Sequence, residues 1–274
     1  MSRQLAFYQW ICRRLQRDEP FSGQPSADLD SLRTVIKPCD VLLVAGHSNV
    51  DRTFKVIGDS RFARAVLYIG RLHDVADPAL RALLADYTPC EPDTQLVIDA
   101  RLERGLIVEP LSALEGRQIR VCRAQGLSEN EAQDVLRYAI SRIGAGGSQS
   151  WAALALLTLM PWRWLPLRWR LNIFRRWAGE LVRALTGTVV ADAFSFVQFP
   201  VLPLVKEDRA GSRLLRLQPR AITAADFDHS PYFEIIKAPF QLTEIPRGMD
   251  AVPWKGNQGC LLYTSPSPRD QAKS

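Results

Sequence analysis

The sequence predicts an α+β protein with one main domain. Short apolar segments typical of strands cluster before residue 124 and again after residue 211, and helical patterns occupy most of the chain between them. Strands and helices do not alternate regularly, which argues against a doubly wound α/β architecture. Hydrophobic residues make up 47% of the 274 residues, enough for a substantial core. We therefore expect a single domain over residues 1–256.

The chain begins with a pattern typical of an amphipathic helix. Apolar residues at positions 5, 8, 11, 12 and 15 predict a helix over residues 4–16. This region has neither an uninterrupted apolar run nor a small-residue cleavage site, so we expect no signal peptide. No stretch of the sequence approaches the roughly 18 apolar residues that a membrane-spanning helix needs. A polar linker over residues 18–29 follows the helix.

The first half of the chain carries most of the predicted strands. Apolar runs at residues 40–46 and 64–70, each ended by glycine, are typical of strands buried on both faces. Pro78 starts a helix that continues through ALRALLADY, because proline is favoured in the first turn. Three further strands are expected at residues 95–99, 106–108 and 118–123.

The second half is mainly helical. Ser128 and Glu131 have the spacing of a capping box, which predicts a helix reaching about Ile143 before a glycine-rich stop. Further helices are expected at residues 149–160, 171–185 and 189–195, and strands at 212–217 and 232–237. Residues 222–231 are expected to form a turn and a short helix. The Ser/Pro-containing residues 257–274 are expected to be a disordered or artefactual tail.

Charge and cysteine content exclude several classes of protein. A net charge of +6 favours anionic partners, but no nucleic-acid recognition motif is present, so we expect no nucleic acid. The cysteines at 12, 39, 90, 122 and 260 form no CxxC pair, which argues against a disulfide framework or zinc site and for the cytoplasm. Because the three histidines are far apart in sequence, we expect no metal site, and no cofactor is implied.

Residues 161–177, PWRWLPLRWRLNIFRRW, form what we call the aromatic–basic element. It contains five arginines, four tryptophans and no acidic residue. Such a composition suits peripheral contact with a membrane interface, and Arg–Trp interleaving can also stack nucleobases. The alternative is a helical subdomain with core tryptophans and solvated arginines. The residues assigned to membrane contact are Trp162, Arg163, Trp164, Arg168, Trp169 and Arg170.

Several stretches, in this order, resemble a known family. DVLLVAGHSNVDRTFKVIGDSRFARAVLYIG, QLVIDARLERGLIVEPL, IRVCRAQGLSENEAQDVLRYAISRIG, AFSFVQFPVLP and ITAADFDHSPYFEIIK resemble the YiiX-type, lipo-like branch of the NlpC superfamily. These proteins are circularly permuted papain-like cysteine hydrolases. The resemblance covers about residues 38–240 and implies a permuted papain-like fold, with a small antiparallel sheet, packed helices and a helical insertion around 149–185.

The same resemblance identifies three catalytic positions. The motif LYIG places the family's histidine at Arg64, and ADAF places its cysteine at Thr186, before the helix expected at 189–195. The family's acidic residue falls on Asp99. An arginine stays protonated at neutral pH and cannot act as a general base, while a threonine hydroxyl needs an adjacent base to become nucleophilic. We expect Arg64 to pair with Asp99 in a salt bridge, or else to bind an anion.

Three functional hypotheses follow. The first is a catalytically inactive pseudoenzyme whose cleft binds an amide- or ester-bearing ligand, either a peptide or a lipid-linked small molecule. The second is an active amidase, peptidase or esterase that uses Thr186 or another nucleophile. The third is a structural or partner-binding module. His47, His73 and His229 are weak candidates for a substitute base, and Cys39, Cys90 and Cys122 are expected to be core residues rather than substitute nucleophiles.

Overall fold

The computed structural model describes residues 3–17, 29–88, 91–101, 105–144, 159–177, 188–208, 211–216 and 222–236. The chain divides into two units, Met1–Ala238 and Pro239–Ser274. Every described residue belongs to the first unit. The expected boundary between residues 256 and 257 lies outside the described residues, so the proposed extent of the domain stays a prediction.

Within the described residues, a six-stranded sheet has the order β4-β3-β2-β1-β5-β8, and all of its neighbours are antiparallel. The α+β class and an antiparallel sheet with packed helices are thus confirmed. A separate hairpin joins β6 and β7. The strands are β1 (Val41–Ala45), β2 (Arg64–Gly70), β3 (Leu96–Arg101), β4 (Gly105–Pro110), β5 (Gln118–Ala124), β6 (Pro203–Asp208), β7 (Gly211–Arg216) and β8 (Phe233–Ile236).

The helices of the described chain follow most of the expected pattern. The α-helices are α1 (Arg3–Gln16), α2 (Leu29–Val35), α3 (Asn49–Gly58), α4 (Pro78–Tyr87), α5 (Glu129–Ser141), α7 (Leu167–Trp177), α8 (Thr188–Phe196) and α9 (Ala224–Asp228). Three short 3₁₀ segments are η1 (Leu72–Asp74), η2 (Leu111–Leu114) and η3 (Trp162–Trp164). The expected capping box is present at α5, where Ser128 Oγ accepts a hydrogen bond from Glu131 N.

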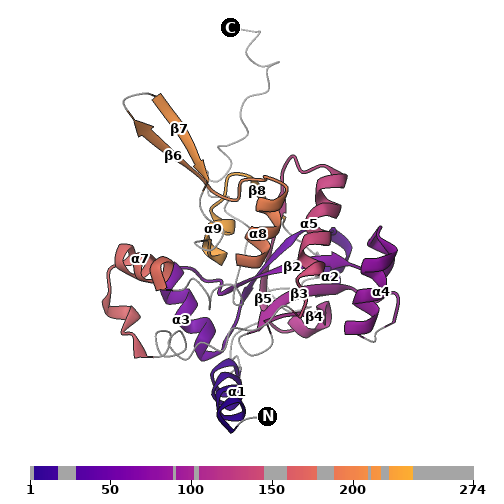
Figure 1. Cartoon of the computed structure of the whole chain (residues 1–274), viewed down its shortest axis with the longest axis horizontal. Helices are drawn as coiled ribbons and strands as arrows, with labels where there is room; N and C mark the ends of the chain where they lie inside the picture. The colour runs from indigo at the N-terminus through magenta and orange to yellow at the C-terminus, as the bar shows by residue number, and fades with distance from the viewer. Residues whose placement is uncertain are drawn as a thin grey trace, which may run out of the picture. The chain divides into compact units, whose positions relative to one another are not determined.

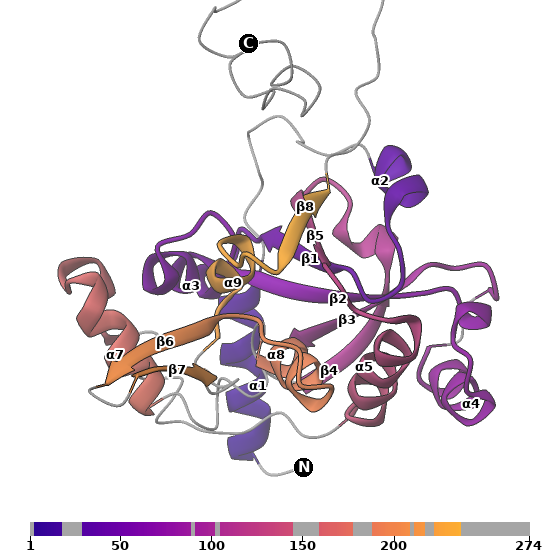
Figure 2. The same cartoon turned by 90° about the horizontal axis from the view of Figure 1, so that it is seen from above.

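The two faces of the central strands pack against different helices. Ala65, Leu67 and Ile69 of β2 belong to the cluster that contains buried residues of α5 and α8. The alternate residues Val66 and Tyr68 belong to a second cluster, which includes Leu32 of α2 and Leu111 of η2. Every residue of β1 and β2 is buried, as expected for continuous apolar strands covered on both sides. Figures 1 and 2 show α5 and α8 lying side by side on the sheet.

A third cluster joins α1, α3 and η3. Tyr8 and Cys12 of α1 pack with Phe54 and Ile57 of α3 and with Trp162. The expected amphipathic N-terminal helix is therefore confirmed, and its apolar side contacts α3. The helix α3 also packs against α7, and the two lie next to each other in Figures 1 and 2.

Some elements differ from the sequence-based expectations. The sequence patterns do not predict α2, α3 or β6, and α7 starts at Leu167, four residues before the expected start. Pro166 directly precedes α7, and the main-chain oxygen of Pro166 accepts a hydrogen bond from Arg170 N in its first turn. Most of the expected 149–160 helix and residues 178–185 of the next one lie outside the described residues.

Candidate functional site

Arg64, the first residue of β2, has a buried guanidinium held between two carboxylates. Its backbone lies opposite Val44 in β1, and the residue is 5% exposed. Arg64 Nη1 donates a hydrogen bond to Asp99 Oδ2, and Arg64 Nε lies 3.3 Å from Asp51 Oδ1. Asp99 and Asp51 are 2% and 4% exposed. The expected salt bridge between Arg64 and Asp99 is thus present, with an unexpected second carboxylate.

Asp51 reaches this site because it also caps α3. Its Oδ2 accepts hydrogen bonds from Ser48 N at 3.2 Å and from Ser48 Oγ at 2.7 Å, while Ser48 Oγ accepts one from Asp51 N at 3.1 Å. One carboxylate oxygen therefore completes a capping box, and the other faces Arg64. Gly46 makes room for this arrangement, since a Cβ there would lie 2.0 Å from Asp51 Oδ2.

The other carboxylate that contacts Arg64 is that of Asp99, which lies in β3. Asp99 lies opposite Ile107 of β4, and its Oδ1 accepts a hydrogen bond from Ala100 N at 2.8 Å. Arg64 Nη2 is also buried but makes no hydrogen bond within the described part of the chain. A buried donor without an acceptor is costly, so this N–H group would favour a hydrogen-bond acceptor such as an ordered water.

The helix α8 begins close to Asp99. Val189 and Val190 of its first turn line a small cavity together with Asp99 and Ala65. The cavity is about 10 Å³, which is about the volume that one water molecule needs. By strand alternation, Arg64 and Asp99 share the sheet face of Val66 and Val97 rather than the face on which α8 packs. The described residues thus bring β2, β3 and the start of α8 together without forming a substrate-sized cleft at this cavity.

Thr186, the expected nucleophile position, lies outside the described residues. The structure therefore shows the contact of Arg64 with Asp99, whereas a shared site with Thr186 stays a prediction. Thr188, the first residue of α8, is fully buried, and its hydroxyl makes no hydrogen bond among the described residues. Sequence reasoning missed Thr188, Ser48 and Asp51. The spacing of Ser48 and Asp51 was a usable signal, because Asp can replace Glu in a capping box.

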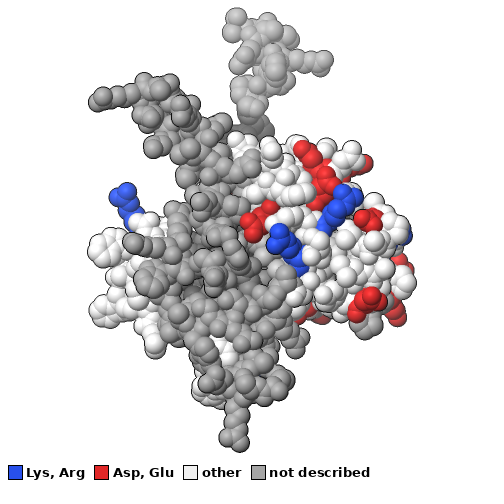
Figure 3. Space-filling view, viewed as in Figure 1, with Lys and Arg blue, Asp and Glu red and all other residues white. Residues whose placement is uncertain are grey.

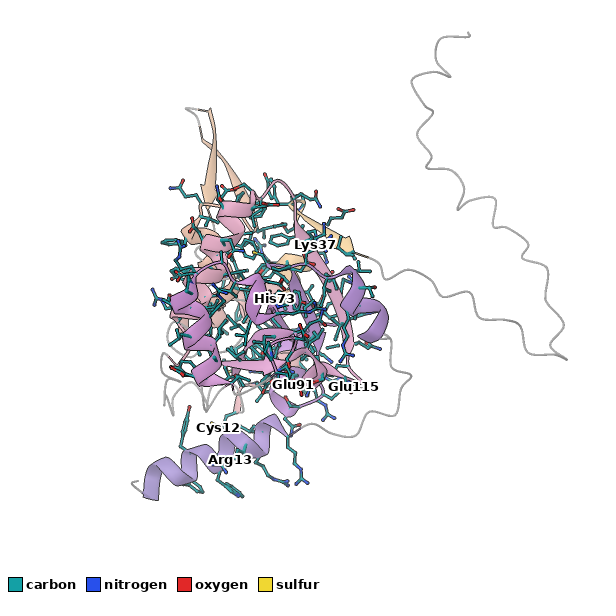
Figure 4. The ribbon with its side chains drawn as sticks, turned by 90° about the vertical axis from the view of Figure 1, so that its right-hand side faces the viewer. Cys12, Arg13, Lys37, His73, Glu91 and Glu115 are labelled. Atoms are coloured by element: carbon teal, nitrogen blue, oxygen red, sulfur yellow. The ribbon has the colours of Figure 1, made fainter. Side chains whose placement is uncertain are left out.

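The histidines occupy three separate places. His73, which is labelled in Figure 4, is more than half exposed. Its Nε2 lies 3.6 Å from Asp74 Oδ1. His229 Nδ1 lies 2.7 Å from the main-chain oxygen of Ala225. His47 is half-buried and directly precedes Ser48, the N-cap of α3. Within the described residues, no group of three His, Cys, Asp or Glu side chains is arranged to hold a metal ion.

The described cysteines are buried in the protein core. Cys39 and Cys122 are members of the cluster beneath α5 and α8, and Cys12 packs against α3. Burial raises the pKa of the Cys39 thiol and of the Cys122 thiol to about 12 each. These thiols are therefore protonated at neutral pH and unsuited to nucleophilic attack. The core assignment is confirmed for Cys39 and Cys122, and Cys90 lies outside the described residues.

The aromatic–basic element divides into buried and exposed residues. Trp162 is 4% exposed and packs in the cluster with α1 and α3, whereas Trp164 and Trp169 are 89% and 63% exposed. Arg163 and Arg168 are exposed. Arg170 donates hydrogen bonds to the main-chain oxygens of Leu165 and Val56, at 2.6 and 2.8 Å. Among the helices that the structure describes, none combines the length and the hydropathy that a membrane-spanning helix requires.

No protein-family model matches the chain, and no curated protein matches it.

Proposed function

We propose that the chain is a catalytically inactive member of the permuted papain-like cysteine hydrolase family that binds an amide- or ester-bearing ligand. The ligand is a peptide or a lipid-linked small molecule. The observation that carries this proposal is the environment of Arg64, which stands where the family has its general base. Its guanidinium is buried and paired with the carboxylates of Asp99 and Asp51.

Arg64 lacks the chemistry of a base. A thiol–imidazole pair works because the two groups exchange a proton near neutral pH, and a guanidinium cannot accept one. General-base assistance contributes roughly 10²- to 10⁴-fold to such reactions. The buried thiols of Cys39 and Cys122, each with a pKa of about 12, do not replace the missing nucleophile.

The site retains the chemistry of binding. Arg64 Nη2 is a buried donor without an acceptor among the described residues. Amide and ester carbonyls are hydrogen-bond acceptors, and an arginine fork suits carboxylates as well. A ligand oxygen near Arg64 would satisfy the remaining donor. The order of the sequence motifs supports a ligand of the family's class.

Activity-based labelling tests this proposal. The full chain is incubated with one thiol-reactive and one hydroxyl-reactive acyl probe, and modified residues are located by mass spectrometry. We expect no labelling of Thr186 above that of Thr94, a loop threonine that serves as the matched reference. Acylation of Thr186 that disappears in Thr186→Ala but persists in Thr94→Ala would instead establish an active hydrolase.

A second experiment tests the scaffold itself. The double variant Arg64→His, Thr186→Cys restores the two family residues, and we expect it to gain thiolate reactivity that neither single variant has. Unfolding measurements on the same variants show whether each remains folded. A folded double variant whose introduced thiol is unreactive would favour the third hypothesis, a structural or partner-binding module, and would contradict the assignment of these positions.

A further inference from the structure

Two adjoining hollows lie between the end of α3 and the aromatic–basic element. The first, which we call the basic hollow, has a volume of about 380 Å³ and is lined by Lys55, Arg61, Arg163 and Arg170, among others. The second, which we call the apolar hollow, has a volume of about 290 Å³, and its lining combines the apolar residues Met160, Pro161, Trp162 and Trp164 with the polar residues Arg52 and Thr53. Val56 and Arg163 line both. The two hollows therefore form one continuous surface with a charged part and an apolar part.

The basic hollow has an excess of positive charge. Asp59 is the one carboxylate among the residues that line it, against four basic residues. Arg61 and Arg163 are exposed, and neither forms an ion pair in the part of the chain that the structure describes. Burial lowers the pKa of Lys55, with Asp51 raising it and Arg52 lowering it. An anion in the hollow would relieve the repulsion between these cations.

The walls of this surface are held in place by Arg170. Its Nη1 donates to the main-chain oxygen of Val56 in α3 at 2.8 Å, and its Nη2 donates to that of Arg163 at 3.4 Å. These bonds connect α7 to α3, and the two helices lie next to each other in Figures 1 and 2. Arg61 from the loop after α3 and Arg163 from η3 thus face a preformed hollow.

Residues 159–169 carry several exposed apolar side chains, of which Trp164 lines the apolar hollow. Trp164 and Trp169 are 89% and 63% exposed, and Leu159 and Leu167 are 80% and 41% exposed. In Figure 3, basic atoms project at the α7 end of the molecule with no acidic atoms beside them in that view. Tryptophan is favoured at the level of lipid headgroups, where its ring is half in the apolar phase, and arginine there binds phosphates.

We propose that this surface binds the phosphate group of an anionic phospholipid in a bilayer. The phosphate lies in the basic hollow among Lys55, Arg61 and Arg163, and Trp164 and Trp169 enter the interfacial layer. A phospholipid is favoured over a free phosphate because the basic hollow continues into an apolar one beneath an exposed tryptophan. The proposal does not depend on the hydrolase assignment, because it uses none of Arg64, Asp99 and Thr186.

Vesicle flotation with the full chain tests the proposal. We expect binding to vesicles that contain phosphatidylglycerol and not to vesicles of phosphatidylcholine alone. Arg61→Ala and Arg163→Ala should each weaken vesicle affinity about five-fold, the equivalent of about 1 kcal/mol for each cation removed from an anionic surface. Trp164→Ala should also weaken binding. Arg81→Ala on α4 and Phe196→Ala on α8 are matched exposed controls and should leave vesicle affinity unchanged.

Several results would overturn the proposal. One is the absence of binding to phosphatidylglycerol vesicles, and another is an equal loss of binding in Arg81→Ala and Arg61→Ala. Soluble glycerol phosphate that binds as tightly as vesicles and is insensitive to Trp164→Ala would identify a free-phosphate site instead. Tighter binding of a single-stranded oligonucleotide than of vesicles would identify a nucleic-acid surface. Unfolding curves of all variants verify that each loss reflects binding rather than misfolding.

Discussion

Arg64 Nε lies 3.3 Å from Asp51 Oδ1, which connects the strand that carries the expected catalytic position to the capping box of α3. A single carboxylate thus serves two elements, one oxygen capping the helix and the other facing a buried guanidinium. With Asp99 on the other side, the cluster contains two buried carboxylates and one guanidinium cation. The stability of this region should therefore depend strongly on Arg64.

Replacing Arg64 by alanine should destabilise the protein by about 3–5 kcal/mol, because two buried carboxylates would lose their common cation. Chemical denaturation followed by circular dichroism measures this loss. Arg61→Ala is the control, since the Arg61 side chain is exposed three residues away and its removal should change the free energy of unfolding by less than about 0.5 kcal/mol. Equal effects of the two substitutions would contradict a structural role for the buried cluster.

Gly46→Ala should also be destabilising, by about 1–3 kcal/mol, because the added Cβ would lie 2.0 Å from Asp51 Oδ2 and force the cap away. Gly58→Ala is the matched control in the same segment. A Cβ there would meet Ala225 Cβ at 3.7 Å, an ordinary contact, and alanine favours a helix. We expect Gly58→Ala to be neutral or stabilising in thermal unfolding. A tolerated Gly46→Ala would show that Asp51 is not held as described.

The stability of the protein should fall as the pH rises above about 9. Cys39 and Cys122 have a pKa of about 12 when folded, raised from 9.0, so the unfolded chain loses these thiol protons first. Between these two pKa values, the free energy of unfolding should fall by about 1.4 kcal/mol per pH unit for each thiol. Urea denaturation as a function of pH measures the slope, which Cys39→Ala and Cys122→Ala should reduce. An unchanged slope in the double variant would indicate that neither thiol is buried.

Alanine substitutions of two tryptophans in the aromatic–basic element should differ sharply in how much stability they cost. Trp162→Ala should cost about 3–5 kcal/mol, since the ring is 4% exposed and packs with Tyr8 and Phe54. Trp164→Ala should change stability by less than about 0.5 kcal/mol, because that ring is 89% exposed. Thermal unfolding compares the two directly. Similar costs would mean that the tryptophans share one environment.

Local patterns in the sequence predict a large part of the described fold. The apolar runs at β1 and β2, Pro78 at the start of α4 and the Ser128–Glu131 box of α5 all lie where the patterns place them. Each of these signals involves residues close in sequence. Sequence analysis missed α3, whose β-branched and polar residues have weak helix propensity and which is stabilised by its cap and by packing against α1 and α7.

The sequence by itself predicted the α+β class and the core character of Cys39 and Cys122, which depend on periodicity and residue type. The pairing of Arg64 with Asp99 was one of two alternatives that the family resemblance left open, and the structure decided between them. Only the tertiary structure revealed Asp51 as a second partner of Arg64, and only it separated buried Trp162 from exposed Trp164. The physical reason is that both features depend on which elements meet in space, and residue types alone do not contain that information. The chemistry of Arg64 follows from its residue type, whereas its burial between two acids follows from the fold.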